Sequence, residues 1–420
     1  QNCDCLTRKN MKTLQREDKE IFDLIKKEEK RQAQTIDLIA SENYPSRAVR
    51  EALGSIYVVK YSEGRPYKRY YGGMENVDAL ETLVEERVRE AFGIGEEWAV
   101  NVQPYSGSPA NYAVYRGLLE RGDAILSLDL AHGGHLTHGS PVSLSGMDYR
   151  IVHYTVDQKT QQLDYDAVAK LALEVRPQLI ITGYSAYSRI IDFEAFGKIA
   201  QKVGARLMAD TAHITGLIIG KAHPSPFPHA DIVTTTTHKT LRGPRGAMII
   251  CREELREKIF PKVFPGLQGG PHNHTIAAIG VALKEAMSPA FRAYASQIVK
   301  NAKQLAKSLQ QLDFQIISGG TDNHVMLVDL RNKGIRGKQA QELLESSGIV
   351  ANRNTIPFDP NPPFNPSGVR FGTPAVTTRG MKEKEMKQIA FWISEVILNP
   401  ESALRVKKEV ASFCKQFPIP

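Results

Sequence analysis

Alternating strand-like and helical patterns in the middle of the chain constrain its fold more than any other feature. Apolar runs typical of strands lie at 99–103, 151–154, 179–183, 205–210 and 247–251, and a run rich in Val, Ile and Thr begins at Asp231 and ends at His238-Lys239. Helical spacing of apolar residues covers 76–92, 164–175 and 193–203. This alternation is typical of a largely parallel sheet with helices on both faces, so the sequence predicts an α/β fold.

The pattern changes near residue 312, which indicates a second, smaller α/β domain. Helical patterns at 275–288 and 294–311 precede short strands at 314–318, 325–330 and 369–371 and helices at 338–347 and 381–397. A helix is expected between residues 8 and 32, and the residues before Met11 are expected to be a ragged end. The 420 residues therefore divide into an N-terminal arm or helix at 1–45, a large domain at 46–292 and a small C-terminal domain at 293–420.

Composition narrows the class of protein. The net charge of +8 comes from 54 basic and 46 acidic residues spread along the chain. No basic cluster with interleaved aromatics marks a nucleic-acid surface, although the excess charge suits anionic small molecules. No run of about 18 apolar residues occurs, so no membrane span is expected. The four cysteines form no CxxC pair, and a reducing compartment, the cytoplasm, is expected.

Lys239 is the residue whose chemistry is most unusual for its setting. Lysines are rarely buried without a partner, yet this one ends an apolar strand. Burial lowers the pKa of an amine, and a lysine of this kind can form a Schiff base with a carbonyl compound. The alternative is a surface lysine at the start of the basic loop 242–246, and this segment alone does not separate the two.

Asp210 ends a second apolar strand, and His213 follows three residues later. Residues at the carboxyl ends of parallel strands meet at one edge of the sheet. A lysine and an aspartate at that edge are what a pyridoxal phosphate site needs, because the lysine holds the aldehyde as an imine and the carboxylate keeps the pyridine nitrogen protonated. Ser185, directly after the strand at 179–183, falls on the same edge. A helix N-cap is the alternative role for Asp210.

The segment Ser106-Gly107-Ser108 is a candidate phosphate site. It lies between a strand and a helical pattern, where the free amides of a helix N-terminus bind phosphate. Serine and glycine begin many helices, so the motif is weak alone. Its place in an α/β chain with a candidate Schiff-base lysine strengthens it.

His132, His135 and His138 recur at intervals of three residues. No carboxylate or cysteine accompanies them, and Gly133-Gly134 interrupts any helix that would align them, so a metal site is disfavoured. An imidazole stacked on a heteroaromatic ring is the favoured interpretation.

Arg370 lies inside a strand-like run in the small domain. An arginine there suits bidentate binding of a carboxylate. A structural ion pair is the alternative role.

Two loops have an unusual composition. Residues 61–73 are dense in Tyr, Gly and charge, which is typical either of a functional loop or of an oligomer contact. The amides of the Gly/Pro loop 264–274 could reach an anion across a subunit boundary, although a plain connector is equally compatible with its composition.

Taken in order, these motifs resemble those of the serine hydroxymethyltransferases, a family of fold-type I pyridoxal phosphate enzymes. The resemblance covers about residues 15–417 and rests on LIASENYPS, KYSEG, KRYYGG, QPYSGSPAN, LAHGGHLTHGSP, SAYSR, DTAHITGLI, VTTTTHKTLRGPRG, VFPGLQGGP, GGTDNH and SGVRFGTPA. It implies a mostly parallel sheet flanked by helices, with a smaller C-terminal α/β domain. It also implies reversible conversion of L-serine and tetrahydrofolate to glycine and 5,10-methylenetetrahydrofolate through aldimine and quinonoid intermediates, a step of one-carbon metabolism.

The resemblance assigns cofactor roles to matching residues. Lys239 would form the internal aldimine, Asp210 would pair with the pyridine nitrogen, and His135 would stack on the ring. Ser185 would bond the phenolic oxygen. The remaining cofactor contacts would come from Ser106, Gly107, Ser108, His213, His238, Tyr61 and Gly270.

The resemblance also implies a homodimer with shared active sites, which leaves a tetramer open. Tyr61, Glu63, Tyr71 and Gly270 would arrive from the partner subunit, and Glu63 would handle protons. Serine or glycine would be held by its carboxylate on Arg370 and Ser41. The catalytic set would be Lys239, Glu63, Asp210, His238, Tyr71 and Thr236, and the folate site would be lined by Leu130, Gly134, Leu136 and Asn354. No metal is implied.

The chain departs from the family pattern at several positions. It has 59-VKYSEGRPY-67 where Asn-Lys-Tyr-Ala-Glu-Gly-Tyr-Pro-Gly is usual, and Tyr105, Thr215 and Ala247 replace a common His, Ala and Gly. Arg65 and Tyr67 beside Glu63 could change the folate or side-chain preference. A folate-independent aldolase or an α-methylserine-type hydroxymethyltransferase is therefore the alternative function, whereas a non-catalytic, RNA-binding role gives no reason for the Lys, Asp and Arg to occur together.

Overall fold

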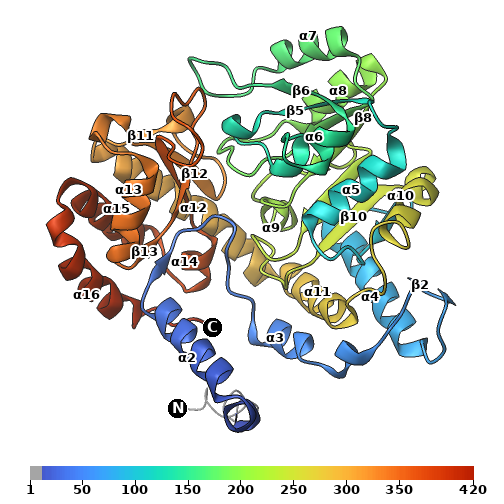
Figure 1. The fold of residues 1–420 in the computed structure, drawn as a ribbon, viewed down its shortest axis with the longest axis horizontal. Helices are drawn as coiled ribbons and strands as arrows, with labels where there is room; N and C mark the ends of the chain where they lie inside the picture. The colour runs from blue at the N-terminus through green and yellow to red at the C-terminus, as the bar shows by residue number, and fades with distance from the viewer. Residues whose placement is uncertain (1–11) are drawn as a thin grey trace.

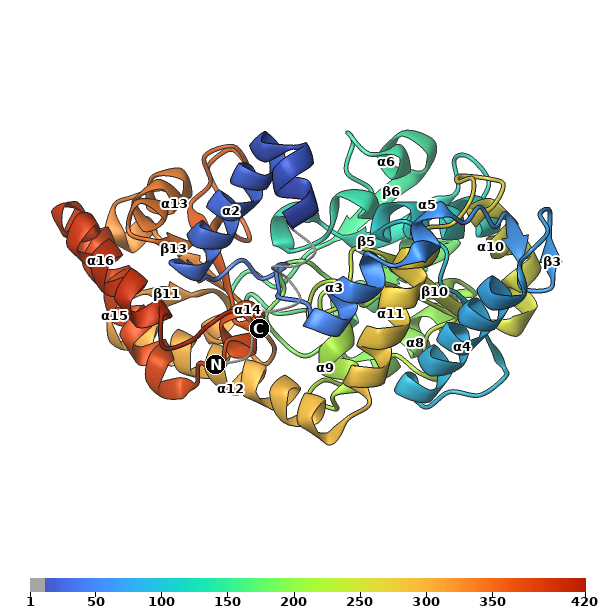
Figure 2. The same cartoon turned by 90° about the horizontal axis from the view of Figure 1, so that it is seen from below.

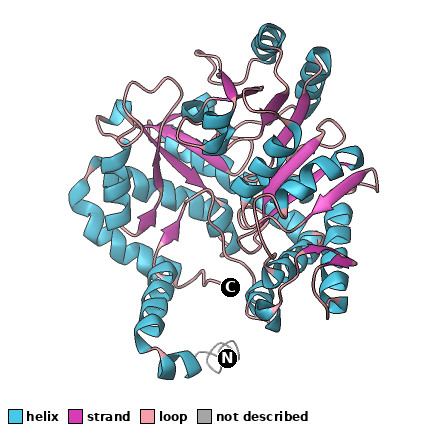
Figure 3. Cartoon of the chain, turned by 45° about the vertical axis from the view of Figure 1, so that its right-hand side comes forward, coloured by secondary structure: helices cyan, strands magenta, loops and turns pink. Residues whose placement is uncertain are grey.

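Two sheets, each with its own helices, organise the part of the chain that the computed structural model describes, residues 12–420 (Figures 1 and 3). The larger sheet has seven strands and the smaller has four. The predicted α/β fold with a mostly parallel sheet is therefore confirmed. The expected ragged end before Met11 lies outside the described residues.

The seven-stranded sheet has the order β4-β10-β9-β8-β7-β5-β6. Strands β6, β5, β7, β8 and β9 run parallel, and β10 is antiparallel to both of its neighbours, β9 and β4. The strands are β4 (Trp98–Asn101), β5 (Ala124–Leu128), β6 (Arg150–Tyr154), β7 (Leu179–Thr182), β8 (Arg206–Asp210), β9 (Ile232–Thr236) and β10 (Ala247–Arg252).

Both faces of this sheet are buried, as the near-continuous apolar strands require. Alternate residues of each strand enter different apolar clusters because successive side chains point to opposite faces. Ile180 and Val233 belong to one cluster, and Ile181 and Ile232 belong to the other. The helices around the large sheet are α3 (Arg47–Leu53), α4 (Glu75–Phe92), α5 (Gly107–Leu118), α6 (Leu144–Asp148), α7 (Tyr165–Val175), α8 (Phe193–Val203), α9 (Thr215–Ile219), α10 (Arg256–Val263) and α11 (Asn273–Ala286).

The smaller sheet has the order β11-β12-β15-β14 and carries Arg370 on its third strand. Its strands are β11 (Gln315–Ile316), β12 (Val325–Asp329), β14 (Asn352–Asn354) and β15 (Gly368–Gly372). The long helix α12 (Pro289–Gln311) enters this domain from the large one; its Ile298 belongs to the large core and its Ala302 to the small core. The other helices here are α13 (Gly337–Ser346), α14 (Pro374–Thr378), α15 (Glu383–Leu398) and α16 (Ala403–Cys414).

The N-terminal arm joins the small domain. Helix α2 (Lys19–Ala33) leads into β1 (Ile36–Asp37), which pairs in parallel with β13 (Ile349–Val350). Ile36 and Leu38 are fully buried in the small domain's apolar core. We propose the division into 1–45, 46–292 and 293–420, which these separate cores support.

A short hairpin projects from the end of the large domain that is remote from the small domain (Figures 1 and 2). It consists of β2 (Gly64–Arg65) and β3 (Lys68–Arg69) and follows a 3-10 helix at Ile56–Val59. The loop predicted at 61–73 is therefore a partly ordered hairpin that lies against α4.

The sequence-based boundaries differ from the structure in several places. The helix expected between residues 8 and 32 has its main part at Lys19–Ala33, since Asp18 caps it, and the strand expected at 99–103 is Trp98–Asn101. The lysine strand ends at Thr236 rather than at Lys239, so residues 237–240 form a turn. The strand expected at 314–318 stops at Ile316, because the backbone turns at Ser318, where φ is 58°. The helix expected to begin at 294 begins at Pro289, since Ser288 caps it and proline suits the first helical position.

No helix among the described residues is long and apolar enough to cross a membrane.

Candidate active site

Lys239 lies in the turn after β9, at the carboxyl edge of the large sheet. Its Nζ donates a 2.9 Å hydrogen bond to Oγ1 of Thr236, and its carbonyl accepts one of 2.9 Å from the Asn43 side chain. Burial lowers the pKa of Lys239 to about 8, although the nearby Asp210 carboxylate opposes this shift. A sizeable fraction of the amine is therefore uncharged near neutral pH, which favours nucleophilic attack on an aldehyde.

Asp210 ends β8 on the same edge, and three groups hold its carboxylate. Nε2 of His138 lies 3.0 Å from Oδ2, the amide of Asn111 donates to Oδ2 at 2.9 Å, and the backbone N–H of Ala212 donates to Oδ1 at 3.1 Å. Burial alone raises the pKa of Asp210, but the hydrogen bond and charge of His138, the charge of His135 and the Asn111 bond outweigh it and hold the pKa below its usual value. Asp210 is therefore a carboxylate at neutral pH. The bond from Ala212 closes a turn directly after β8, whereas the next helix, α9, has Ile214 as its N-cap residue. The helix N-cap role considered for Asp210 is therefore wrong, and its pairing with a cofactor ring stays a prediction.

The His135 imidazole is fixed as one neutral tautomer. The backbone N–H of Thr137 donates to Nδ1 at 3.2 Å, and the Thr137 hydroxyl lies 2.7 Å from the same atom. That hydroxyl already accepts a bond from Asn111 at 2.9 Å, so its own proton points to Nδ1. Burial lowers the pKa of His135 to about 4, and the remaining proton is therefore on Nε2. An uncharged ring of this kind suits stacking on a heteroaromatic ring.

His213 lies buried beside a residue to which the sequence assigned no role. Its Nδ1 is 3.2 Å from Nε2 of His324, and the two rings are stacked with centroids 5.4 Å apart. Burial lowers the pKa of His213 well below its usual value and that of His324 to about 3, and the charges of Lys239 and Arg370 add to both shifts. Both rings are neutral and line the same site as Lys239.

Ser106, Gly107 and Ser108 lie where β4 and its following loop meet the start of α5. Ser106 is the N-cap residue but makes no side-chain capping bond, which leaves the first amides of the helix without that partner. Gly107 lies against the lysine strand, since a Cβ added there would come within 2.8 Å of the Thr236 methyl group. The helix N-terminus, which favours an anion, therefore faces the turn that carries Lys239.

Arg370 on β15 brings the small domain to the site. Its Nη1 donates to the Ser185 carbonyl at 2.9 Å, and its Nε donates to Asn352 at 3.2 Å. No carboxylate of the described residues lies within ion-pair distance of its guanidinium, so the structural ion pair considered from the sequence is not present there. Burial lowers the pKa of Arg370 to about 10, which still leaves it charged. The segment that leads to Ser41 lies beside the end of this strand, because the Gly372 N–H donates to the Leu38 carbonyl at 2.7 Å and a Cβ on Gly372 would lie 2.4 Å from Cα of Ala40.

The loop after β5 contacts the same region through Ser185. The Gly133 carbonyl accepts the backbone N–H of Ser185 at 2.8 Å, and Gly134 packs so closely on the chain that an added Cβ would lie 2.3 Å from the Leu128 carbonyl. Leu130 and Leu136 in this loop are 43% and 50% exposed. Asn354 lies on β14, two residues from the Asn352 that bonds Arg370. Apolar side chains thus flank the mouth of the site.

Tyr61, Glu63, Tyr71 and Gly270 form a separate group around the hairpin. The Tyr71 hydroxyl donates to Glu63 at 3.3 Å, the Tyr61 and Tyr71 rings have centroids 5.3 Å apart, and a Cβ on Gly270 would meet the Tyr61 ring at 3.2 Å. In the described part of the chain, no hydrogen bond joins these side chains to Lys239, Asp210 or Arg370. The structure therefore brings the sequence-predicted residues together in two groups.

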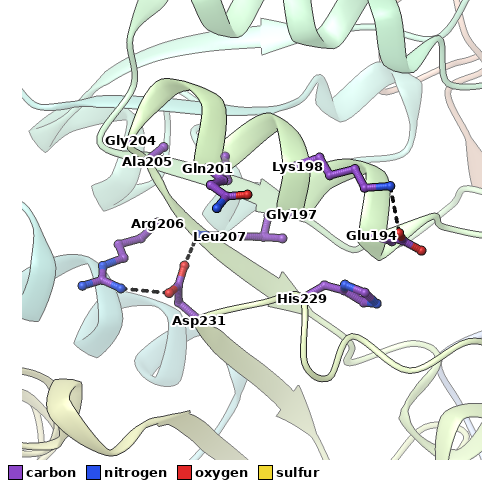
Figure 4. Close-up of a pocket in the computed structure, with 11 residues that line it drawn as sticks. Glu194, Gly197, Lys198, Gln201, Gly204, Ala205, Arg206, Leu207, His229 and Asp231 are labelled. Atoms are coloured by element: carbon purple, nitrogen blue, oxygen red, sulfur yellow. Dashed lines mark hydrogen bonds and ion pairs between the residues drawn. The ribbon is translucent and has the colours of Figure 1, made fainter.

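A cavity on the large sheet lies away from both groups. It has a volume of about 610 Å³ and is lined by Arg206, Asp231, Glu194, Lys198 and their neighbours (Figure 4). Since β8 begins at Arg206 and ends at Asp210, this cavity is at the opposite edge of the sheet. Its charged groups pair with one another, as in the 2.9 Å contact of Arg206 with Asp231 and the 2.8 Å contact of Lys198 with Glu194. It is therefore no candidate for the chemistry.

A comparison with protein families identifies the chain. The family model described as "Serine hydroxymethyltransferase" matches residues 14–393, nine-tenths of the sequence. The chain belongs to the serine hydroxymethyltransferase family. The resemblance noted in the motifs is thus confirmed, and family membership makes the chain a transferase that depends on pyridoxal phosphate.

The site of this serine hydroxymethyltransferase family member fits pyridoxal phosphate. The helix N-terminus at Ser106 suits the phosphate, Lys239 the aldehyde and Asp210 the ring nitrogen. In addition, Nδ1 of His238 is buried and has no hydrogen-bond partner among the described residues, as expected of a polar group that faces a ligand. No group of three His, Cys, Asp or Glu side chains in residues 12–420 is arranged to hold a metal ion.

Sequence reasoning missed the residues that hold the site residues in place. Asn111, Thr137, His138 and His324 all lie within motifs that supported the resemblance, but a role in positioning the site residues was predicted for none of them. Asn111 bonds Asp210 across 99 positions of sequence and accepts a 2.7 Å bond from Thr234. The only signal in the sequence was their place inside those motifs.

Proposed function

We propose that this chain catalyses the reversible conversion of L-serine and tetrahydrofolate to glycine and 5,10-methylenetetrahydrofolate. One observation carries the proposal: a single site combines the Lys239 amine of lowered pKa, the Asp210 carboxylate and the Arg370 guanidinium, which has no acidic partner in the described chain. These are the groups needed to hold an aldehyde cofactor, to protonate its ring and to bind an amino acid carboxylate.

The residues on the large sheet would hold the cofactor. Pyridoxal phosphate, when bound, supplies an electron sink for the electron pair left at Cα as the Cα–Cβ bond of serine breaks. Asp210 would accept the N–H of the pyridine ring and keep that proton there, and His138 would keep Asp210 aligned. His135 would cover one face of the ring. The other proposed contacts come from Ser106, Gly107, Ser108, Ser185, His213 and His238. Thr236, whose hydroxyl accepts a bond from Lys239, would belong to the catalytic set.

Arg370 and Ser41 would orient the amino acid. A bidentate grip on the α-carboxylate limits rotation about Cα, so the bond to be cleaved is held perpendicular to the ring. Leu130, Gly134, Leu136 and Asn354 would contact the pteridine of tetrahydrofolate. The exposure of Leu130 and Leu136 supports this assignment, since apolar side chains at the mouth of a polar site favour a flat ring.

We also propose a homodimer in which Tyr61, Glu63, Tyr71 and Gly270 act in the partner's site. Three features support this arrangement. These residues lie together on the end of the large domain, they make no hydrogen bond to the cofactor residues of their own described chain, and the 3-10 helix before them exposes Ile56, Val58 and Val59 by 78%, 57% and 68%. An apolar surface of this kind next to reactive side chains is typical of a subunit interface.

The cytoplasm stays the proposed location. The buried, unpaired thiols of Cys251 and Cys414 are compatible with a reducing compartment.

A folate titration tests the proposed function. With glycine bound to the cofactor-loaded protein, tetrahydrofolate is expected to produce a new visible absorbance band, and serine plus tetrahydrofolate is expected to yield glycine. Cleavage of 3-hydroxy amino acids without any response to folate would instead indicate a folate-independent aldolase. Turnover of α-methylserine in preference to serine would indicate the α-methylserine-type enzyme.

A further inference from the structure

Arg69 grips the backbone on both sides of Glu63. Its side chain is only 3% exposed, and its Nη1 donates hydrogen bonds of 2.9 Å to the carbonyls of Ser62 and of Gly64. One guanidinium group thus fixes the peptide before Glu63 and the peptide after Gly64. Glu63 itself carries its carboxylate outward, toward the Tyr71 hydroxyl.

The same guanidinium is anchored on helix α4. Nε of Arg69 donates to Oδ1 of Asp78 at 2.8 Å, and Nη2 donates to Oε2 of Glu81 at 2.7 Å. Both carboxylates are buried, and such a planar fork holds its partners in one geometry. The backbone around Glu63 is therefore anchored to helix α4 and not to a surface loop.

A second set of hydrogen bonds connects Gly64 and Glu81 to the segment that leads to Ser106. Nε2 of Gln103 donates to the Gly64 carbonyl at 2.9 Å and to Oε1 of Glu81 at 2.8 Å. Gln103 is three residues before Ser106, and its carbonyl accepts a 3.0 Å bond from Gln268, two residues before Gly270. The backbone around Glu63 is thus fixed relative to the Ser106 segment and to the segment that carries Gly270.

Gly64 shows how little freedom this backbone has. Its φ is +103°, and a Cβ there would lie 2.3 Å from the Lys68 carbonyl, so only glycine fits. Because its carbonyl accepts bonds from both Arg69 and Gln103, the peptide between Gly64 and Arg65 has one orientation.

We propose that Arg69 is a positioning residue for Glu63. By fixing the backbone around Glu63, Arg69 holds the Glu63 carboxylate where it can reach the substrate in the partner's site. This inference rests on the proposed function, in which Glu63 handles protons. Arg69 does not touch substrate or cofactor. It acts through the two carbonyls that flank Glu63.

Arg69→Lys tests the proposal, with Arg65→Lys as its matched control. Lysine keeps the charge facing Asp78 and Glu81 but cannot bond both carbonyls. Arg65 lies on the same hairpin and pairs with the same Glu81, at 2.9 Å, but makes no bond to Ser62 or Gly64. A misplacement of about 1 Å costs on the order of 100-fold in rate, so kcat is expected to fall about 10- to 100-fold in Arg69→Lys, with the KM for serine and the cofactor affinity nearly unchanged. Arg65→Lys is expected to retain kcat within about threefold.

A double-mutant cycle separates positioning from general stabilisation. If Arg69 acts through Glu63, then adding Arg69→Lys to Glu63→Gln lowers kcat little further. Additive losses in the cycle, wild-type kcat in Arg69→Lys, or equal losses in Arg69→Lys and Arg65→Lys would overturn the proposal.

Amide hydrogen exchange of the cofactor-free protein tests the clamp without any activity. The Tyr70 N–H donates to the Glu63 carbonyl at 3.1 Å, so its exchange is expected to speed up in Arg69→Lys but not in Arg65→Lys. Unchanged exchange refutes the clamp. The two proposals can also fail separately. If the wild-type protein does not turn over serine with folate, but Tyr70 exchange is still faster in Arg69→Lys than in Arg65→Lys, then the proposed function is refuted and the role of Arg69 in fixing the backbone stands.

Discussion

Nε2 of His138 lies 3.0 Å from Oδ2 of Asp210, at the centre of the site. His138 comes from the loop after β5, and Asp210 ends β8, two strands away in the sheet. The bond joins the loop that carries His135 to the carboxylate proposed to pair with the cofactor ring. This hydrogen bond therefore fixes the position of His135 relative to Asp210, two of the residues proposed to contact the cofactor.

Replacing His138 with leucine is expected to destabilise the cofactor-free protein at neutral pH. A hydrogen bond to a charged group contributes about 1.5–3 kcal/mol. The pKa of Asp210 is lowered in the folded protein, so this stabilisation is present above the unfolded pKa of about 4 and is lost as the pH falls below it. Urea unfolding at neutral and acidic pH measures the difference. His138→Gln, whose amide can also donate, is the control, and a loss in His138→Leu that does not shrink with acid would contradict the argument.

The lowered pKa of Lys239 predicts the pH dependence of cofactor attachment. Only the neutral amine attacks an aldehyde, and the pKa of Lys239 is about 8. The rate of colour development after pyridoxal phosphate is mixed with cofactor-free protein is therefore expected to rise about tenfold per pH unit below that pKa and then to level off. Lys239→Ala should remain colourless.

Asp210→Asn is the informative control for this titration. The Asp210 carboxylate raises the pKa of Lys239 against the effect of burial, so its removal is expected to move the midpoint to lower pH. A midpoint near that of a free lysine, about 10.4, would mean that the amine faces water.

Arg370 is expected to determine the affinity for the amino acid carboxylate. Arg370→Lys keeps a positive charge but loses the fork that makes two parallel bonds, and Arg370→Ala loses both. Because truncating one partner of a desolvated charge pair costs about 2–5 kcal/mol, the KM for serine should rise at least 30-fold in Arg370→Ala and less in Arg370→Lys. Steady-state kinetics with serine, and with a substrate analogue that lacks the carboxylate, checks the assignment. Equal losses for both compounds would indicate a structural defect instead.

The fold could be predicted where local pattern decides it. The strands ending at Thr182 and Asp210 are continuous apolar runs buried on both faces, and both were predicted within one residue. Strand β5 was missed, because the five residues Ala124–Leu128 lie between a turn and the histidine-rich loop and give no periodic signal. The order of the strands and the antiparallel direction of β10 depend on long-range pairing, which single-sequence patterns do not contain.

The part of the site that could be predicted from the residues alone depends on one rule: the carboxyl ends of parallel strands lie at the same edge of a sheet. That rule placed Asp210 near Lys239, and family motifs supplied Arg370 from another domain. It could not identify His138 and Asn111, whose bonds to Asp210 span 72 and 99 residues. Arg65 was expected to influence substrate choice because of its neighbour Glu63, but its guanidinium turns back to Glu81 on α4.

Tyr105, one of the departures from the family pattern, is expected to stabilise the loop that contains Gly270. Its hydroxyl donates to the Gly270 carbonyl at 2.7 Å, and its ring stacks on His272 with centroids 4.1 Å apart. Tyr105→Phe keeps the stacking and removes the hydrogen bond, which contributes about 0.5–1.5 kcal/mol. Thermal unfolding should show a Tm lowered by about 1–2 °C, and Gly270 amide exchange should become faster. A change in the Tm without a change in exchange at 270 would contradict this assignment.

Hybrid dimers test whether Lys239 of one subunit works with Glu63 of the other. Lys239→Ala and Glu63→Gln homodimers are each expected to be nearly inactive, since general acid–base catalysis contributes about 10²- to 10⁴-fold and the lysine is required for attachment. If sites are shared, subunit exchange between the two variants creates dimers with one fully wild-type site and one doubly defective site. Half of the dimers are then hybrids with one of two sites intact, so roughly a quarter of wild-type activity should return. If each subunit used its own Glu63, every site in the hybrid would carry one defect and no activity would return.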